Sequence, residues 1–387
     1  MTSTHLPFGH PAWIEIDLKQ FKKNIKAIQN HVGHAKICLA IKANAYGHGL
    51  IPIAREAVKA GVHCLAVASL QEGALLREAG IKIPVLVFGA IHDEQISGLL
   101  NYDLEFSISS RLKAELVKKK CEALQKKCRV HLEIDTGMQR TGVRLSSALD
   151  LLNDLVQMKC FDIAGVYSHL ATADNPDNEF AHHQIKSFQK FIREEVKSKD
   201  KNIICHIANS SGISYYPESH MDMVRPGILA YGYFPTQHNE KLKDIAPIFS
   251  VKAKIVYFKV VSKGQGIGYS HTYKTQEDSR ILTIPVGYGD GYRRGLSNKG
   301  EVLIRGKRYP IVGNICMDQL MVNIGQDEAY VGEEVTLIGK QEHEEIKLTE
   351  VAKLCDTITY EILCGFNNRL PRMYIDDGQV FFEDKRH

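Results

Sequence analysis

The sequence predicts an α/β protein in which a (β/α)8 barrel of the TIM type is followed by a mostly antiparallel β domain. First, eight short apolar segments alternate with helical patterns through about the first 230 residues, and such alternation requires parallel strands with right-handed crossovers. Second, long β-type runs separated by Gly and Asn turns follow residue 240. Third, 387 residues are enough for two domains. We therefore expect a barrel over 1–244 and a β domain over 245–387. The first 12 or so residues could belong to the β domain instead of the barrel.

The barrel strands are expected where apolar runs are bounded by turns, at 36–41, 63–68, 84–88, 104–108, 130–135, 162–168, 202–207 and 221–224. Helical patterns lie at 17–33, 51–61, 70–80 and 179–196, the first of them with Asp17 placed to cap it and Gly33 placed to end it. An open, doubly wound sheet is the rival fold. It usually has a Gly-rich turn after its first strand, whereas here the first strand ends in Lys42.

The β domain follows a polar linker at 237–244. Its expected strands are 249–261, 280–288, 301–313, 319–324 and 333–339, and one helix is expected at 348–355.

Composition excludes several classes of protein. Hydrophobic residues make up 44%, and 49 Lys and Arg against 45 Asp and Glu leave a net charge of +4 without a basic block, so no nucleic-acid partner is expected. The nine cysteines form no CxxC pair, which argues against a disulfide framework or a metal site and favours a reducing compartment. The first residues lack the basic and apolar pattern of a signal peptide, so none is expected, and no apolar run approaches the ~20 residues that span a bilayer. We expect a cytoplasmic protein.

Polar residues gather where the barrel strands end, which is where chemistry sits in this fold. They are Lys42, the segment 135–140, Ser168 and His169, the segment 209–212, and the segment 225–227. A lysine beside other cations can lose its proton and form a Schiff base. Lys42 could instead be an ordinary surface lysine, but an apolar strand delivers it to the barrel mouth.

The turns after the seventh and eighth strands are the usual phosphate site of such barrels. Here they read Ala-Asn-Ser-Ser-Gly (208–212) and Arg-Pro-Gly-Ile (225–228), which offer hydroxyl and backbone N–H donors. The first turn could also be only a helix cap. A Schiff-base lysine and a phosphate cradle together indicate a phosphorylated aldehyde, for which pyridoxal 5′-phosphate (PLP) is the natural candidate.

Motifs along nearly the whole chain resemble those of the alanine racemase family. They are AIKANAYGHG (40–49), DTGMxR (135–140), SHLATAD (168–174), ANS (208–210), RPGI (225–228), GYS (268–270), GYGDG (287–291) and ICMDQ (315–319). The first resembles the PLP-lysine signature of the family.

The resemblance implies a homodimeric enzyme that interconverts L- and D-alanine by a two-base mechanism. Lys42 would carry PLP covalently and serve as one base, and Tyr269 would be the other, acting on the cofactor of the partner subunit. Arg225 would face the pyridine nitrogen and His169 would orient Tyr269 and Arg225. Two bases suit the reaction because a proton leaves one face of the α-carbon and returns to the other.

The resemblance also assigns binding and supporting residues. The phosphate would be bound by Tyr46, Ser210, Gly227 and Ile228 with Asn209 nearby; the substrate carboxylate would be held by Arg140 and Met317; and the access channel would be lined or supported by Asp174, Tyr288, Arg294 and Asp318. The family role would be to supply D-alanine for cell-wall peptidoglycan.

Two positions depart from the family pattern. Many relatives have a lysine, thought to be carbamylated, where this chain has Glu133. Strand alternation points Glu133 into the barrel, where a carboxylate needs a partner, and Arg140 is the natural one; an unrelated polar plug is the alternative. Asn368 stands where some relatives place a tyrosine near the phosphate, which leaves one phosphate contact open.

Four other functions are alternatives for this sequence. One is a racemase of broader preference, for serine or lysine, and another is a PLP amino-acid decarboxylase with this two-domain architecture. DTGMxR and RPGI argue against the decarboxylase. A PLP-binding protein without catalysis would lack the β domain and Tyr269, and a cofactor-free Schiff-base aldolase would give no reason for the phosphate cradle.

Overall fold

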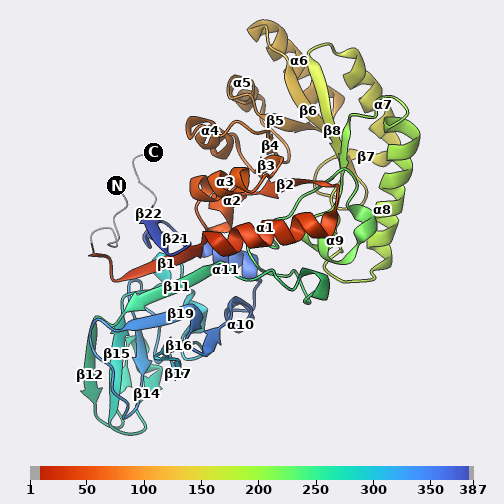
Figure 1. Ribbon diagram of the computed structural model, residues 1–387. Helices are drawn as coiled ribbons and strands as arrows, with labels where there is room; N and C mark the ends of the chain where they lie inside the picture. The colour runs from red at the N-terminus through yellow and green to blue at the C-terminus, as the bar shows by residue number, and fades with distance from the viewer. Residues whose placement is uncertain (1–8, 383–387) are drawn as a thin grey trace. The chain divides into compact units, whose positions relative to one another are not determined.

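The computed structural model describes residues 9–382, which form two compact units (Figure 1). The barrel unit comprises Gln20–Ala45 and Leu50–Ala246. The second unit holds Tyr46–Gly49, the residues from Pro247 onwards and, at the start of the described chain, those up to Lys19. The expectation for the first 12 or so residues falls largely outside the described range. No described helix is both long and apolar enough to cross a membrane.

The barrel unit contains an eight-stranded parallel sheet, as the sequence predicts. Its order is β10-β2-β3-β4-β5-β6-β8-β9, with the short β7 (Val143–Arg144) beside β6. Two backbone hydrogen bonds join β9 to β10: Asp222 N–H donates to the Cys205 carbonyl at 3.2 Å and Arg225 N–H to that of Ala208 at 2.8 Å. The sheet is therefore nearly closed. The strands are β2 (Lys36–Ala40), β3 (Cys64–Val67), β4 (Val85–Val87), β5 (Glu105–Ile108), β6 (Cys128–Asp135), β8 (Phe161–Tyr167), β9 (Ile204–His206) and β10 (Met223–Val224).

Helices connect these strands, and the four that the sequence predicts are present. The helices are α1 (Leu18–Val32), α3 (Leu50–Lys59), α4 (Leu70–Glu78), α5 (Ile96–Asn101), α6 (Arg111–Leu124), α7 (Leu145–Gln157), α8 (Glu179–Phe191) and α9 (Ser210–Tyr215). A π-helical turn (Ile192–Val196) extends α8. Gly33, at φ +64°, ends α1 as expected, because an L residue there would be strained.

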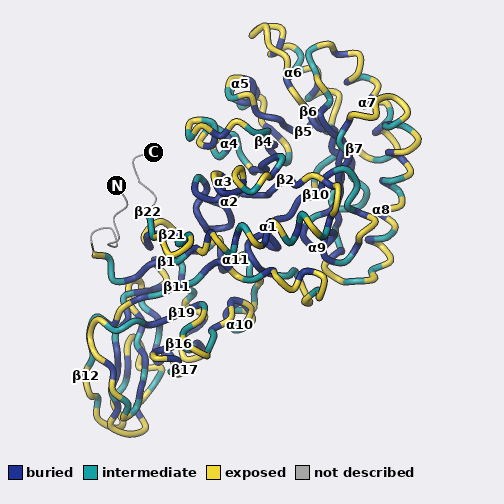
Figure 2. The backbone as a smooth tube through the Cα atoms, in the orientation of Figure 1, coloured by how far each residue is buried: buried dark blue, intermediate teal, exposed yellow. Residues whose placement is uncertain are grey.

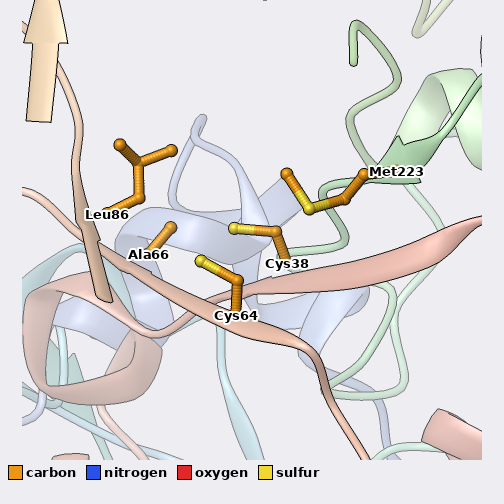
Figure 3. Packing of buried hydrophobic residues seen from close by; sticks show 5 residues of the cluster. All are labelled: Cys38, Cys64, Ala66, Leu86 and Met223. Carbon is orange, nitrogen blue, oxygen red and sulfur yellow. The ribbon is translucent and has the colours of Figure 1, made fainter. Parts of the chain in front are cut away.

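The barrel strands are buried along most of their length, while the outer faces of α4–α8 carry much of the exposed surface (Figure 2). One buried cluster joins four neighbouring strands, and Figure 3 shows its side chains gathered on one side of the sheet. It consists of Cys38, Cys64, Ala66, Leu86 and Met223. All nine cysteines are free thiols.

The second unit is built on a mixed sheet of order β17-β16-β19-β11-β1-β21-β22, with β20 beside β19. A smaller sheet, β12-β15-β18, and the pair β13-β14 complete it. The strands are β1 (Ala12–Asp17), β11 (Phe249–Lys254), β12 (Tyr257–Val261), β13 (Gly266–Ile267), β14 (Tyr273–Lys274), β15 (Ser279–Ile284), β16 (Glu301–Ile304), β17 (Lys307–Pro310), β18 (Leu320–Asn323), β19 (Glu334–Gln341), β20 (Glu344–Ile346), β21 (Arg372–Asp376) and β22 (Gln379–Phe382). The helices are α10 (Leu348–Leu354) and α11 (Thr359–Gly365).

Three long runs expected as single strands are divided or shortened. The run 249–261 breaks at Ile255, because β11 pairs with β1 and β19 whereas β12 pairs with β15 in the other sheet. The run 301–313 is a hairpin, since Arg305 and Gly306 both have positive φ and form its two-residue turn. The run 280–288 ends as a strand at Ile284. Residues 12–17, not expected as a strand, pair in parallel with β21.

Candidate functional site

Lys42 begins a left-handed turn directly after β2. The strand end is held on both sides, because Ala40 N–H donates to the Pro226 carbonyl at 2.9 Å and Ile41 N–H to that of Ala66 at 2.8 Å. Four consecutive non-glycine residues, 43–46, then have φ of 53–54°. This conformation costs about 1–2 kcal/mol per L residue. The backbone at Lys42 is therefore strained and must be stabilised by its surroundings.

Glu72 on α4 is the main stabiliser of this turn. Its two carboxylate oxygens accept hydrogen bonds from Ala43 N–H at 2.7 Å and from Ala68 N–H at 2.9 Å. The Asn44 side chain accepts a third bond from Leu50 N–H at 2.8 Å. Asn44 also tolerates the left-handed conformation better than most residues. These bonds hold the strand end, and with it Lys42, at the carboxyl rim of the barrel.

Arg225 follows β10 and is buried at the same rim. Its guanidinium donates to the carbonyl of Ser168 at 2.7 Å, to that of Ile207 at 3.1 Å, and to Nδ1 of His206 at 2.8 Å. The ring of Tyr167 lies under it, 5.2 Å from the guanidinium carbon. These contacts leave the arginine little rotational freedom.

His169, two residues after the end of β8, lies between cations. Its Nδ1 is 3.3 Å from an Arg225 nitrogen. Burial, and then the charges of Arg225, Arg140 and Lys42, lower the pKa of His169 to about 3. An imidazole in this place is neutral at physiological pH, so Nδ1 can accept a hydrogen bond from the arginine. The sequence-predicted Lys42, Arg140, His169 and Arg225 are therefore near one another.

The turns after β9 and β10 contact each other through Ser210. Its hydroxyl accepts hydrogen bonds from Gly227 N–H at 2.9 Å and Leu229 N–H at 3.3 Å. Asn209 caps α9 by accepting from Gly212 N–H at 2.9 Å. Within the described residues the backbone N–H groups of the buried Ser210 and Ile228 make no hydrogen bond. Buried backbone N–H groups without partners, gathered in the two turns after β9 and β10, can bind an anion.

Glu133 is buried on β6, but it does not form the expected ion pair with Arg140. Its Oε1 accepts from the Thr141 hydroxyl at 2.7 Å, and its Oε2 is buried without a hydrogen bond among the described residues. Arg140 is exposed in the following loop. Asp135 shapes that loop by accepting from Gly137 N–H and Gln139 N–H. The expectation of a direct Glu133–Arg140 partnership is wrong for this structure, because Thr141 lies nearer to the carboxylate.

The second unit presents three candidate side chains to solvent. The exposed fractions are 72% for Tyr269, 53% for Met317 and 43% for Tyr288. Tyr269 lies on a tight turn in which Gly268 and Ser270 have positive φ, and its carbonyl accepts from the Asn314 amide at 2.9 Å. Gly289 N–H donates to the Met317 carbonyl at 2.8 Å, which joins two of the loops.

The remaining candidates are scattered over both units. Asp318 pairs with Arg369 at 2.6 Å, and Asn368 accepts from Arg372 at 3.4 Å. Tyr46 is buried and belongs to the second unit. Arg294 in that unit and Asp174 in the barrel unit are exposed.

Comparison with known proteins agrees with this geometry. The model of the alanine racemase N-terminal domain matches residues 16–235, and that of the C-terminal domain matches residues 248–374. The chain belongs to the alanine racemase family. An alanine racemase of Symbiobacterium thermophilum is 40% identical over 365 residues, which cover 94% of this chain and 97% of the relative. One of Clostridium kluyveri is 38% identical over 373 residues, 96% and 95% of the two chains.

Solved alanine racemase structures share the fold. That from Clostridium difficile has a TM-score of 0.90 at 34% identity and covers 97% of this chain and 99% of its own. That from Bacillus anthracis with bound L-Ala-P has a TM-score of 0.88 at 34% identity, with 97% of each chain covered. The Bartonella henselae enzyme, solved with covalently bound pyridoxal phosphate, has a TM-score of 0.84 at 27% identity and covers 94% and 99%.

The sequence reasoning missed several residues that support this alanine racemase site. Glu72, His206 and Glu105 are polar side chains whose partners lie far away in the chain. One signal was available: His206 and Glu105 are polar residues within short apolar strands. A buried polar side chain requires a partner, but the sequence does not name it.

Proposed function

We propose that this alanine racemase family member, a PLP-dependent enzyme that interconverts L- and D-alanine, uses Lys42 and Tyr269 as its two bases. The observation that carries the proposal is the gathering of Lys42, Arg140 and Arg225 around a neutral His169 at the carboxyl rim of the barrel. One of these cations can bind the cofactor covalently, and the others suit its charged and polar groups.

The residues present fit PLP. The buried N–H groups of Ser210 and Ile228, which make no hydrogen bond within the described part of the chain, offer donors for the phosphate, with Gly227 and Asn209 in the same double turn. Arg225, rigidly held, offers a permanent donor to the pyridine nitrogen, and Lys42 offers the amine for covalent attachment. Tyr46 is proposed as a further phosphate ligand. Asn368 has no tyrosine hydroxyl to add.

When bound, PLP withdraws electrons from the substrate and so acidifies the α-proton. Lys42 would hold or release that proton on one face of the α-carbon and Tyr269 on the other. Arg225 cannot give up its own proton, so it keeps the facing nitrogen an acceptor. His169, neutral and bonded to Arg225, would relay orientation from Arg225 to Tyr269.

Tyr269 is proposed to act on the partner subunit's cofactor in a homodimer. Tyr269, Met317 and Tyr288 leave large apolar surfaces exposed in the single chain. Exposed aromatic and methionine side chains of this kind are typical of surfaces that a partner covers.

The substrate carboxylate is assigned to Arg140 and the backbone of Met317, and Asp174, Tyr288, Arg294 and Asp318 to the access channel. Glu133 accepts from the hydroxyl of Thr141, the residue after Arg140, and would in this way help to position the loop that carries Arg140. We place the activity in the cytoplasm, where it would supply D-alanine for peptidoglycan. The nine free thiols fit a reducing compartment.

The first test is purification followed by an assay of D-alanine formation from L-alanine, with serine and lysine tested in parallel. We expect a visible cofactor absorbance that borohydride reduction alters permanently, with label on the peptide that contains Lys42. Rapid conversion of alanine and slow conversion of the others supports the proposal. Carbon dioxide release from a basic amino acid would show a decarboxylase, and equal rates with serine or lysine a broader racemase.

Subunit complementation tests the assignment of Tyr269. Lys42→Ala and Tyr269→Phe each inactivate the homodimer, whereas a mixed dimer contains one site with an intact lysine and an intact tyrosine from the other subunit. Random mixing would then restore roughly one quarter of the wild-type activity, because half of the dimers are mixed and each has one working site. No restoration in verified mixed dimers would show that Tyr269 acts within its own subunit.

A further inference from the structure

Four polar side chains form one continuous hydrogen-bonded chain inside the barrel. Glu105 on β5 contacts Nε2 of His131 on β6 at 2.8 Å. Nδ1 of His131 contacts Nε2 of His206 on β9 at 3.1 Å, and Nδ1 of His206 contacts the Arg225 guanidinium at 2.8 Å. All four residues are at most 6% exposed. This hydrogen-bonded chain of side chains runs from the middle of the sheet to the rim where the cofactor site lies.

The two ends of this chain determine where every proton lies. Arginine can only donate, so His206 must accept at Nδ1 and carry its proton on Nε2. That proton is donated to Nδ1 of His131, which must therefore carry its own proton on Nε2. The last bond is accepted by Glu105. In any other arrangement, at least one pair of facing hydrogen-bonding atoms would have either two protons or no proton between them, and that hydrogen bond would be lost.

Several features keep this order stable. Burial, followed by the charge of Arg225, lowers the pKa of His206 far below its ordinary value and keeps the ring neutral. Burial alone would raise the pKa of Glu105, but the hydrogen bond from His131 and the charge of Arg129 outweigh it and lower the pKa. Glu105 and Arg129 lie 2.5 Å apart, and Arg129 also contacts the exposed Asp162 at 3.3 Å. Glu105 is therefore ionised and can only accept.

The backbone of β8 and the packing of an aromatic ring restrict the positions that the two imidazoles can take. A Cβ on Gly165 would lie 2.5 Å from Nδ1 of His131, so only glycine allows the imidazole to reach His206. The Tyr167 ring stacks on His206 with centroids 5.0 Å apart and an interplanar angle of 10°. The imidazoles are held in one orientation, which preserves the direction of the hydrogen bonds.

Among the described residues, no carboxylate lies within ion-pair distance of Arg225. A buried charge of this kind usually needs a carboxylate partner. The hydrogen-bonded path from Arg225 to a carboxylate therefore runs through two imidazoles.

We propose that Glu105 is a positioning residue that acts through His131 and His206 to hold a bare His206 nitrogen against Arg225. This inference rests on the proposed function in one respect, namely that Arg225 faces the pyridine nitrogen of PLP. Without an acceptor at position 105, the Nε2–H of His131 would be buried without a partner, and the ring would turn toward another one, which weakens its bond to His206. His206 would then be held less firmly against Arg225, and the guanidinium would be free to turn from its place at the rim.

Neutron diffraction from crystals of the PLP-loaded enzyme tests the proton order directly. We expect deuterium on Nε2 of both His131 and His206, with no deuterium on either Nδ1. Deuterium on Nδ1 of His206, or on both nitrogens of either ring, would overturn the inference. This readout needs no substituted protein, so it remains decisive if a variant fails to fold.

Two substitutions and one control test the role of Glu105. Glu105→Leu removes the acceptor, Glu105→Gln keeps an oxygen that can accept from His131, and Asp162→Asn changes the other carboxylate beside Arg129 without entering the chain. Loss of a hydrogen bond to the charged Arg225 predicts roughly 10- to 100-fold weaker PLP binding in Glu105→Leu. Glu105→Gln should recover most of this loss, and Asp162→Asn should bind PLP like the unmodified protein.

Equal PLP affinity for Glu105→Leu and the unmodified enzyme would refute the positioning role. Equal weakening by Leu and Gln would also refute it, since a requirement for the negative charge alone predicts no recovery by an uncharged acceptor. Failure of the proposed function is distinguishable, because a protein that does not racemise alanine still yields the two proton positions and the PLP affinities.

Discussion

Replacing Glu72 by glutamine tests whether the strained turn at Lys42 depends on a carboxylate. Glutamine has nearly the same shape, but only one of its two terminal atoms can accept a hydrogen bond. Ala43 N–H and Ala68 N–H both donate to Glu72. In the variant one of them would face the NH2 group, which also donates. One of the two hydrogen bonds to residue 72 is lost, and the acceptor of the other is no longer charged.

The expected loss can be estimated from the bonds and the strain. The four left-handed residues after Lys42 cost about 4–8 kcal/mol in total, somewhat less because asparagine is one of them. Hydrogen bonds to a charged group contribute about 1.5–3 kcal/mol each, and the partial exposure of Glu72 favours the lower end. We expect Glu72→Gln to lower the free energy of unfolding by about 2 kcal/mol.

Urea unfolding and PLP loading measure the two consequences. The turn should relax toward ordinary backbone angles and displace Lys42, so the fraction of enzyme that retains PLP after dialysis should fall together with kcat. Glu78→Gln is the control on the same helix, because Glu78 only accepts from the exposed Tyr102 hydroxyl. An unchanged unfolding midpoint and unchanged PLP retention in Glu72→Gln would refute the view that this carboxylate stabilises the turn.

Four further predictions follow from other parts of the site. Gly165→Ala places a methyl group against the buried imidazole of His131 and should cost about 1–3 kcal/mol in urea unfolding, whereas Gly295→Ala, with space around it, should cost little. Arg225→Glu should raise transamination relative to racemisation, measured as pyruvate formed per D-alanine, and an unchanged ratio would contradict the role given to the arginine. Glu133→Gln should raise the KM for alanine, and an unchanged KM and kcat would make Glu133 a polar plug. His169 has a folded-state pKa of about 3, so its contribution to stability is complete above pH ~6.5 and falls by about 2 kcal/mol by pH 5; His169→Gln should flatten urea-unfolding stability between pH 8 and 5, and an equally steep profile would contradict this.

The eight barrel strands were predictable because each is a short apolar run, and burial on both faces of a parallel sheet favours such runs. Lys42, His169 and Arg225 were predictable as site residues because each lies within two residues of a strand end. The β domain was harder. Its long runs contain positions where the chain leaves one sheet for another, as at Ile255, and alternation of side chains continues through such a break.

The contacts of Glu72 and Glu105 were not predictable from the sequence for a different reason. Glu72 supports a turn 29 residues earlier in the chain, and nothing in the sequence around Lys42 signals left-handed backbone. Asn44 is the one residue there that favours it. A sequence pattern reports which side of a strand a residue occupies, but it does not report which side chain from another strand it meets.

Taken one at a time, Glu105, His131 and His206 are unfavourable in a barrel interior, because each buries a polar group. Together they satisfy one another, and the directional order of their bonds requires that all be present with the arginine. A deletion in the middle of such a chain leaves two unsatisfied groups, whereas a substitution at its outer end leaves one. Loss of His131 should therefore be more damaging to folding than loss of Glu105. Glu105 is for that reason the position where the effect on Arg225 can be separated from the effect on the barrel.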